Sequence, residues 1–202
     1  MEYLSAIGLK GIIIPSHIRA KDLGVKWFRK FWAKAEQMGM PIYIHPRGFT
    51  HDEWLHEYFL WNSIGQPLEE ALAMSSIIYE GILDDFPKLK IIIALGGGYL
   101  PYYAGRTDKA YESRAETRTN ISFPPSDYLR RFFYDTVVFD RDVLELLIKK
   151  AGDKQIMMGT DYPRGEVEED PVGFINKSKN LSRHTKDRIL GLNAAKLLGV
   201  KA

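Results

Sequence analysis

The chain has 202 residues, of which 45% are hydrophobic and 27% are charged, and its formal net charge at pH 7 is +2. This composition is that of a globular protein; the nearly balanced charge provides no basic stripe for nucleic acid, and the absence of cysteine excludes disulfides, thiolate zinc sites and cysteine nucleophiles. No apolar run approaches the roughly 18 residues of a membrane span, and residues 1–10 lack the pattern of a signal peptide, so we expect a cytoplasmic protein that binds no membrane.

The first part of the chain predicts two buried strands joined by a helix. Residues 11–15 are a short β-branched run that ends in proline, and residues 41–45 are a second apolar run that ends in histidine. Between them, apolar residues recur at helical spacing over 28–38, which predicts an amphipathic helix that stops at Gly39.

The remainder predicts three further strands with their helices, after an irregular, aromatic-rich segment at 49–66. Each of the three strands is a short apolar run, and each helix has apolar residues at helical spacing. The expected elements are, in order, a helix at 68–86, a strand at 91–95 followed by a triple glycine at 96–98, a strand at 134–138, a helix at 143–148, a strand at 155–161 and two short closing helices, the last at 194–198.

Strands that are apolar on both faces and alternate with helices are typical of a parallel sheet covered by helices. The pattern provides about five strand–helix units, whereas a complete (β/α)8 barrel usually needs about 250 residues. The residues therefore leave two architectures open, an open doubly wound sheet or a barrel without its first strands. No repeat or linker divides the sequence, so we expect one domain over residues 1–202.

Two of the expected strands end in residues that could bind a metal. His45 ends the second strand and Asp161 ends the fifth, and chemistry in parallel α/β folds is concentrated at the carboxyl ends of strands. Imidazole and carboxylate are suitable ligands for a divalent ion, and Asp161 could also serve as a general base for metal-bound water. Each residue also has a structural interpretation, His45 as a hydrogen-bonded strand end and Asp161 as a turn former before Tyr162 and Pro163.

Other polar or aromatic residues have weaker functional interpretations. The triple glycine at 96–98 either permits a tight turn or lets a ligand approach the backbone, and a phosphate cradle is the weaker option because the glycine-rich phosphate motifs are absent. We expect His51 and His56 to be surface or loop residues. Trp54 or Trp61 could form the wall of an aromatic substrate pocket, with packing in the core or a loop as the alternative.

Several segments, in this order, resemble the amidohydrolase superfamily, in particular its branch similar to aminocarboxymuconate-semialdehyde decarboxylase. The resemblance covers nearly the whole chain. The matching segments are Pro41-Ile42-Tyr43-Ile44-His45-Pro46, Phe86-Pro87-Lys88-Leu89-Lys90 with the strand and glycines up to Gly98, Tyr134-Asp135-Thr136, Met158-Gly159-Thr160-Asp161-Tyr162-Pro163 and Asn193-Ala194-Ala195-Lys196-Leu197-Leu198-Gly199.

The resemblance implies a (β/α)8 TIM-barrel-type fold with one divalent metal ion, most often zinc. It implies that His45 and Asp161 are metal ligands, and in the leading hypothesis Asp161 also serves as the catalytic proton-transfer group. The implied chemistry is decarboxylation or hydrolysis of a small unsaturated or aromatic carboxylic acid. Arg47, Tyr162 and Arg164 follow the two ligands directly in the sequence, so we expect them to contact the anionic substrate.

The sequence departs from the family pattern in two places. The histidine that the family has before the triple glycine is Leu95 here, and leucine can neither bind metal nor transfer a proton. The family's opening H-x-H strand has no counterpart, so that about three strand–helix units are lacking. We therefore keep an alternative function, in which a degenerate or partial barrel acts as a non-catalytic binding or assembly subunit. In either case we expect a homodimer or a partner to cover the exposed sheet edges.

Overall fold

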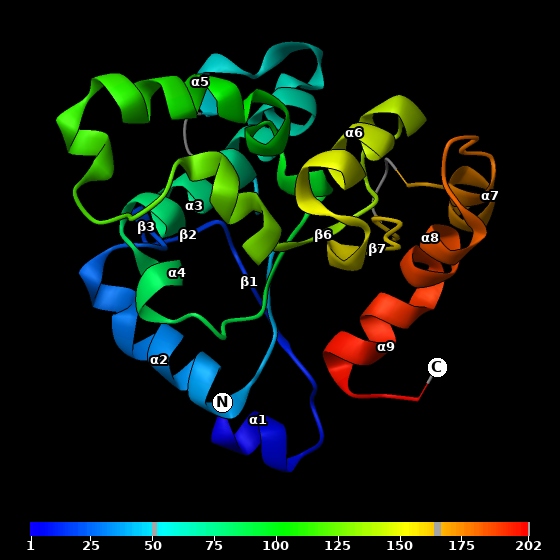
Figure 1. Ribbon diagram of the computed structural model, residues 1–202, viewed down its shortest axis with the longest axis horizontal. Coiled ribbons are helices and arrows are strands. Elements are labelled where there is room, and N and C mark those ends of the chain that lie inside the picture. Colours follow the sequence, from blue (N-terminus) through cyan, green and yellow to red (C-terminus); the bar gives the residue numbers. More distant parts are fainter. Residues whose placement is uncertain (50–51, 164–166, 202) are drawn as a thin grey trace.

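The computed structural model describes residues 1–49, 52–163 and 167–201, and it is built on a five-stranded parallel sheet (Figure 1). The strand order is β1-β4-β5-β6-β7, so β1 and β7 form the two edges. All five strands lie within or directly next to the predicted apolar runs, although each is only two or three residues long. Their bounds are β1 (Ile12–Ile14), β4 (Ile42–Ile44), β5 (Ile91–Ile93), β6 (Phe133–Asp135) and β7 (Ile156–Met157).

Helices connect and cover these strands. Figure 1 shows α2 and α4 on one side of the sheet and α7 to α9 beside β7 on the other. A small antiparallel hairpin, β2 (His17–Ile18) with β3 (Lys21–Asp22), follows β1. The helices are α1 (Glu2–Ala6), α2 (Arg29–Met38), α3 (Gln66–Tyr79), α4 (Ile82–Asp85), α5 (Leu100–Ser113), α6 (Arg141–Ala151), α7 (Pro171–Asn176), α8 (Arg183–Asp187) and α9 (Asn193–Leu198), with π-helical turns η4 (Trp61–Gly65) and η9 (Arg188–Leu192).

Two helix predictions need correction. The helix expected over 68–86 is interrupted at Gly81, which takes a left-handed φ of 70° between α3 and α4. A side chain at this position would meet the carbonyl oxygen of Asn120, so the chain turn also depends on a contact that is distant in sequence. Helix α5 was not expected, because its hydrophobic spacing is interrupted by charged and polar residues at 105–109.

The two faces of the sheet differ in how well they are covered. Side chains alternate between faces along a strand, and the face toward the helices is buried, with Ile42 and Ile91 fully inaccessible. On the opposite face the strand register aligns Ile13, Tyr43, Ile92 and Phe133 in one row. None of these four is fully buried, and Ile13 on the edge strand is 70% exposed. The described chain thus leaves this face and the β1 edge open.

The closing helix anchors the strand that leads to Asp161. The Asn193 side-chain amide donates hydrogen bonds to the carbonyl oxygens of Asp153 and Ile156, both at 2.7 Å. The latter carbonyl is the first of β7, so the Asn-Ala-Ala-Lys segment holds β7 in place from the side opposite β6. In the described part of the chain no helix is both long and apolar enough to cross a membrane.

Candidate metal and substrate site

The structure brings His45 and Asp161 together, although 116 positions separate them in the sequence. His45 directly follows β4, and Asp161 lies in the loop that follows β7. The His45 Nε2 atom is 3.4 Å from Oδ1 of Asp161. Both side chains are mostly buried, and the backbone of Asp161 is left-handed with a φ of 59°, a conformation that aspartate tolerates better than most residues.

Hydrogen bonding of the other ring nitrogen orients His45 so that Nε2 faces the carboxylate. Nδ1 lies 2.9 Å from the carbonyl oxygen of Pro46, and because a carbonyl can only accept, Nδ1 must carry the proton. Nε2 then faces an oxygen of Asp161. Either a proton on Nε2 or a metal cation can join the two groups, and a histidine whose other nitrogen is held by a carbonyl is a typical metal ligand.

These two residues fit one half of a divalent metal site. Nitrogen and carboxylate donors suit zinc and manganese alike. Among the described residues, however, no group of three histidine or acidic side chains is placed to hold a metal ion. Catalytic zinc sites usually have three protein ligands, so His45 and Asp161 account for only part of such a set.

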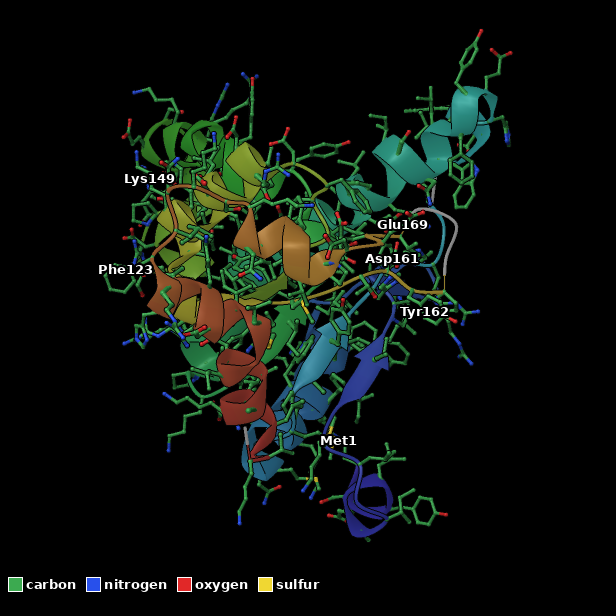
Figure 2. The ribbon with its side chains drawn as sticks, turned by 90° about the vertical axis from the view of Figure 1, so that its right-hand side faces the viewer. Met1, Phe123, Lys149, Asp161, Tyr162 and Glu169 are labelled. Atoms are coloured by element: carbon green, nitrogen blue, oxygen red, sulfur yellow. The ribbon has the colours of Figure 1, made fainter. Side chains whose placement is uncertain are left out.

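A pocket of about 400 Å³ surrounds this pair at the open β1 edge. Its lining includes Arg47, Tyr162 and Ile13, together with the two candidate ligands. Figure 2 shows Asp161 and Tyr162 close to one another on the right-hand side of the molecule, above Met1. Arg47 is exposed and Tyr162 is 80% exposed, so both expected substrate contacts lie at the mouth of the pocket. The third, Arg164, lies outside the described residues.

The other aromatic and imidazole candidates that the structure describes do not line this pocket. Trp54 is 79% exposed, Trp61 lies in the π-helical turn η4, and His56 is exposed. His51 lies outside the described residues. Leu95, the residue in the place of the family's histidine, starts the turn after β5 and has a left-handed φ of 52°.

The sequence analysis missed the buried carboxylate of Asp135, which organises the strand ends. It accepts hydrogen bonds from the Tyr43 hydroxyl at 2.8 Å and from three backbone N–H groups, those of Leu95, Gly96 and Val137, at 2.9 to 3.1 Å. Burial raises the pKa of Asp135, and the hydrogen bonds oppose that shift. Asp135 thereby links the end of β6 to β4 and to the glycine turn. An acidic residue at the end of an apolar strand is the signal that could have revealed it.

A second buried acid, Glu70 on α3, has no such partners. Both of its carboxyl oxygens are inaccessible and lack a hydrogen-bond partner among the described residues. Burial raises the pKa of Glu70 well above its usual range, and the nearby Asp135 and Glu69 raise it further. Glu70 is therefore a neutral acid in the folded protein at moderate pH, because an isolated buried charge would be far more costly.

We expect Glu70→Gln to be more stable than the wild-type chain at pH 8 and nearly equal to it near pH 4. As pH rises above the unfolded pKa of about 4.3, the unfolded chain loses a proton that folded Glu70 keeps, so wild-type stability falls until pH exceeds the folded pKa. Each unit between the two pKa values corresponds to about 1.4 kcal/mol. Urea unfolding across this pH range measures the difference, with the exposed Glu116→Gln as control. A difference for Glu70→Gln that does not change with pH would contradict the assignment.

The known proteins to which the chain is similar include decarboxylases. The family model described as Amidohydrolase matches residues 1–200. The chain is 32% identical over 195 residues to 2-amino-3-carboxymuconate-6-semialdehyde decarboxylase of Dictyostelium discoideum. The matched region covers 96% of this chain and 54% of the relative. The chain thus spans about half the length of the curated relatives it matches.

Solved structures show the same fold. The 5-carboxyvanillate decarboxylase of Sphingomonas paucimobilis superposes with a TM-score of 0.86 at 27% identity, over 96% of this chain and 59% of that one. A dihydroxybenzoic acid decarboxylase from Polaromonas, solved with bound manganese and 2-nitroresorcinol, has a TM-score of 0.84 at 21% identity, over 97% of this chain and 62% of that one. The predicted fold, part of a (β/α)8 barrel, is confirmed, and the open doubly wound sheet is excluded.

Proposed function

Because the chain belongs to the amidohydrolase family, we propose that it provides the His45–Asp161 part of the metal site of a carboxy-lyase. The proposed substrate is a small aromatic or unsaturated carboxylic acid, the class that the similar decarboxylases act on by name. One observation carries the proposal: Nε2 of His45 lies 3.4 Å from an oxygen of Asp161, while Nδ1 of the same ring lies 2.9 Å from the carbonyl oxygen of Pro46.

The residues around this pair have distinct proposed roles. Arg47 lies at the pocket mouth, where its guanidinium can pair with the substrate carboxylate in a bidentate contact. In decarboxylation the bond to the carboxylate breaks, CO2 leaves, and the electron pair left on carbon takes up a proton. Asp161 is the acid we propose to hold and deliver that proton, because Leu95 cannot. Tyr162 and Arg164 are proposed to contact the substrate from the loop after β7.

The proposed metal is a divalent ion, with zinc as the first candidate and manganese as the second. When bound, such an ion would supply Lewis-acid stabilisation of the substrate carboxylate. The mixed nitrogen and oxygen donor set accommodates either ion. We propose that the remaining donors come from a segment that packs on the open β1 edge, since that edge borders the pocket.

A second function is favoured by Leu95 and by the incomplete ligand set. A chain with two candidate metal ligands among its described residues and no imidazole before the glycine turn could serve as a non-catalytic binding or assembly subunit of a barrel. The two functions can be distinguished by one measurement, since only the enzyme would release CO2 from the substrate in a metal-dependent reaction.

Metal content and CO2 release test the proposal directly. The 202-residue chain is loaded with zinc or manganese, the bound metal is measured by mass spectrometry, and CO2 release from aromatic carboxylates is followed. We expect His45→Ala to weaken metal binding by about 100-fold or more and to abolish any metal-dependent release. His56→Ala removes an exposed histidine outside the pocket and is the matched control. Equal metal affinity in wild type and His45→Ala would overturn the metal site.

A further inference from the structure

A cavity of about 300 Å³ lies on the side of the molecule opposite the candidate metal site. Its lining comes from α4, from the short helix η7 (Pro125–Arg131) and from the loop before η7. Helix α4 leads into β5 and η7 leads into β6, so the cavity lies at the amino ends of the parallel strands, whereas Asp161 follows β7 at their carboxyl ends. Figure 2 shows Phe123, which lines this cavity, on the left-hand side of the molecule and Asp161 on the right-hand side.

Hydrogen bonds fix the floor of the cavity. The hydroxyl of the buried Tyr128 donates to Oδ2 of Asp84 at 2.7 Å. The backbone N–H of Ser122 is shared between the same two groups, at 3.2 Å from Oδ2 of Asp84 and 3.1 Å from the Tyr128 oxygen. Burial, and after it the hydrogen bond to Asp84, raises the pKa of Tyr128 to about 12, so the phenol keeps the proton that it donates. Pro124 and Pro125 restrict the backbone that leads into η7, and the cavity is therefore formed before any ligand binds.

A positive charge at one side of the cavity has no carboxylate partner in the described chain. Nη2 of Arg131 donates to the carbonyl oxygens of Leu83 and Pro87, at 3.2 and 2.8 Å. These bonds close the end of α4, but a neutral carbonyl does not neutralise the guanidinium. Among the described residues Nε and Nη1 of Arg131 have no hydrogen-bond acceptor, so their N–H groups are available to a ligand in the cavity.

Two carboxylates line the same cavity, and neither forms an ion pair with Arg131 in the described part of the chain. Only Oδ2 of Asp84 accepts hydrogen bonds there, and the Asp127 side chain accepts none. Both residues are exposed. A single solvated surface charge needs no partner. Opposite charges that line one cavity without pairing, however, are complementary to a ligand that carries both signs.

An exposed aromatic ring completes the cavity. Phe123 is 57% exposed, and its ring centroid lies 6.5 Å from that of Tyr128. A lone exposed apolar side chain is common on protein surfaces, but this ring stands beside both signs of charge at a preformed hollow. Small-molecule sites typically combine an apolar surface of this kind with a few convergent polar groups.

We propose that this cavity binds a free α-amino acid with an apolar side chain. The ammonium group pairs with Asp84 and Asp127, the carboxylate accepts hydrogen bonds from Nε and Nη1 of Arg131, and the side chain packs against Phe123. The cavity volume of about 300 Å³ accommodates a molecule of this size. Because the site uses neither the candidate metal ligands nor the β1 edge, it goes beyond the proposed carboxy-lyase.

Three ligands with the same benzene ring test the proposal in the 202-residue chain. L-phenylalanine carries both charges, 2-phenylethylamine lacks the carboxylate, and 3-phenylpropanoate lacks the ammonium group. Their affinities are measured by isothermal titration calorimetry at pH 7 without added metal. We expect L-phenylalanine to bind at least about 10-fold more tightly than either analogue, because a hydrogen bond to a charged group contributes that much or more. Equal affinities for all three, or no binding of L-phenylalanine, would overturn the proposal.

Substitution of the two charges should change the selectivity in opposite ways. Asp127→Asn should weaken the binding of L-phenylalanine and 2-phenylethylamine about 10-fold and should not weaken that of 3-phenylpropanoate. Arg131→Gln should weaken L-phenylalanine and 3-phenylpropanoate and leave 2-phenylethylamine unchanged. Asp22→Asn removes an exposed carboxylate outside the cavity and is the matched control. Unchanged affinity of Asp127→Asn for both ammonium ligands would overturn the assignment.

Urea unfolding of each variant separates ligand contacts from folding. The Asp127 side chain has no hydrogen-bond partner or ion pair among the described residues, so Asp127→Asn should unfold at the same urea concentration as the wild type. Arg131→Gln also loses the bonds that close α4, and the Asp127 variant keeps the proposal testable if it does not fold. His45→Ala should leave L-phenylalanine affinity unchanged. A loss of L-phenylalanine binding in His45→Ala would place the amino acid at the other end of the sheet and overturn the proposal.

Discussion

Replacing Asp135 by alanine is expected to lower the free energy of unfolding by about 3–5 kcal/mol. The substitution removes the common acceptor of one hydroxyl and three backbone N–H groups at the ends of β4, β5 and β6. A buried donor that loses its partner costs about 1–3 kcal/mol. Because those donors belong to three different segments, the loss should also loosen the turn that carries Leu95.

Two milder variants show how much of the effect comes from each part of the network. Asp135→Asn keeps one acceptor oxygen and should cost less than the alanine variant. Tyr43→Phe removes a single hydrogen bond and should cost about 1 kcal/mol. Equilibrium unfolding in urea measures all three. An Asp135→Ala variant within 1 kcal/mol of wild type would mean that the carboxylate does not organise the strand ends.

Gly98→Ala is the second substitution expected to have a large effect, with a loss of at least about 3 kcal/mol or no folded protein at all. Gly98 has a φ of 59° and a ψ of −127°, a backbone conformation that side-chain-bearing residues rarely adopt. A Cβ atom there would lie 1.8 Å from the carbonyl oxygen of Pro67 at the start of α3. Gly98 and Pro67 both line a cavity of about 730 Å³ next to Leu95, so a shift of either the turn or the start of α3 would change the wall of that cavity.

Gly105→Ala is the matched control for this substitution. Gly105 lies within α5, and a Cβ atom there would meet nothing within 4 Å. Alanine is the better helix former by about 1 kcal/mol, so this variant should be as stable as wild type or more stable. Thermal unfolding of both variants provides the comparison. If Gly98→Ala instead folds normally and only loses ligand binding, the glycine is needed so that a ligand can approach the backbone. The contact that a Cβ atom would make with Pro67 favours the other interpretation, in which the glycine is needed for folding.

The order and type of the strands could be predicted because the evidence for them is local. Short β-branched runs bounded by glycine and proline indicate buried strands wherever they are placed, and the five runs became the five strands of the parallel sheet. The predicted helix boundaries were less accurate where a contact with a residue distant in sequence determines where the helix ends. The break at Gly81 depends on Asn120, which no hydrophobic period in 68–86 can indicate.

The meeting of His45 and Asp161 in the candidate site could also be predicted from the sequence, whereas the burial of the acids around it could not. Parallel strands direct their carboxyl ends to one edge of the sheet, so His45 and Asp161 were expected to meet, and the structure places them 3.4 Å apart. Their roles as metal ligands stay a prediction. The position of Asp135 at the end of an apolar strand is a sequence signal for a role there, whereas the burial of Asp135 and Glu70 is a property of the assembled layers that the sequence does not show.

The sequence by itself determined the parallel strand–helix class, the His45 and Asp161 strand ends, and the leucine that precedes the triple glycine. These features depend on residue type and on spacings of a few residues, which the chain specifies before it folds. Only the tertiary structure decided the proton position on His45, the four donors around Asp135 and the cavity beside Leu95. Such features join residues as far apart as Tyr43 and Asp135, 92 positions in sequence, and arise only when packing removes water from between them.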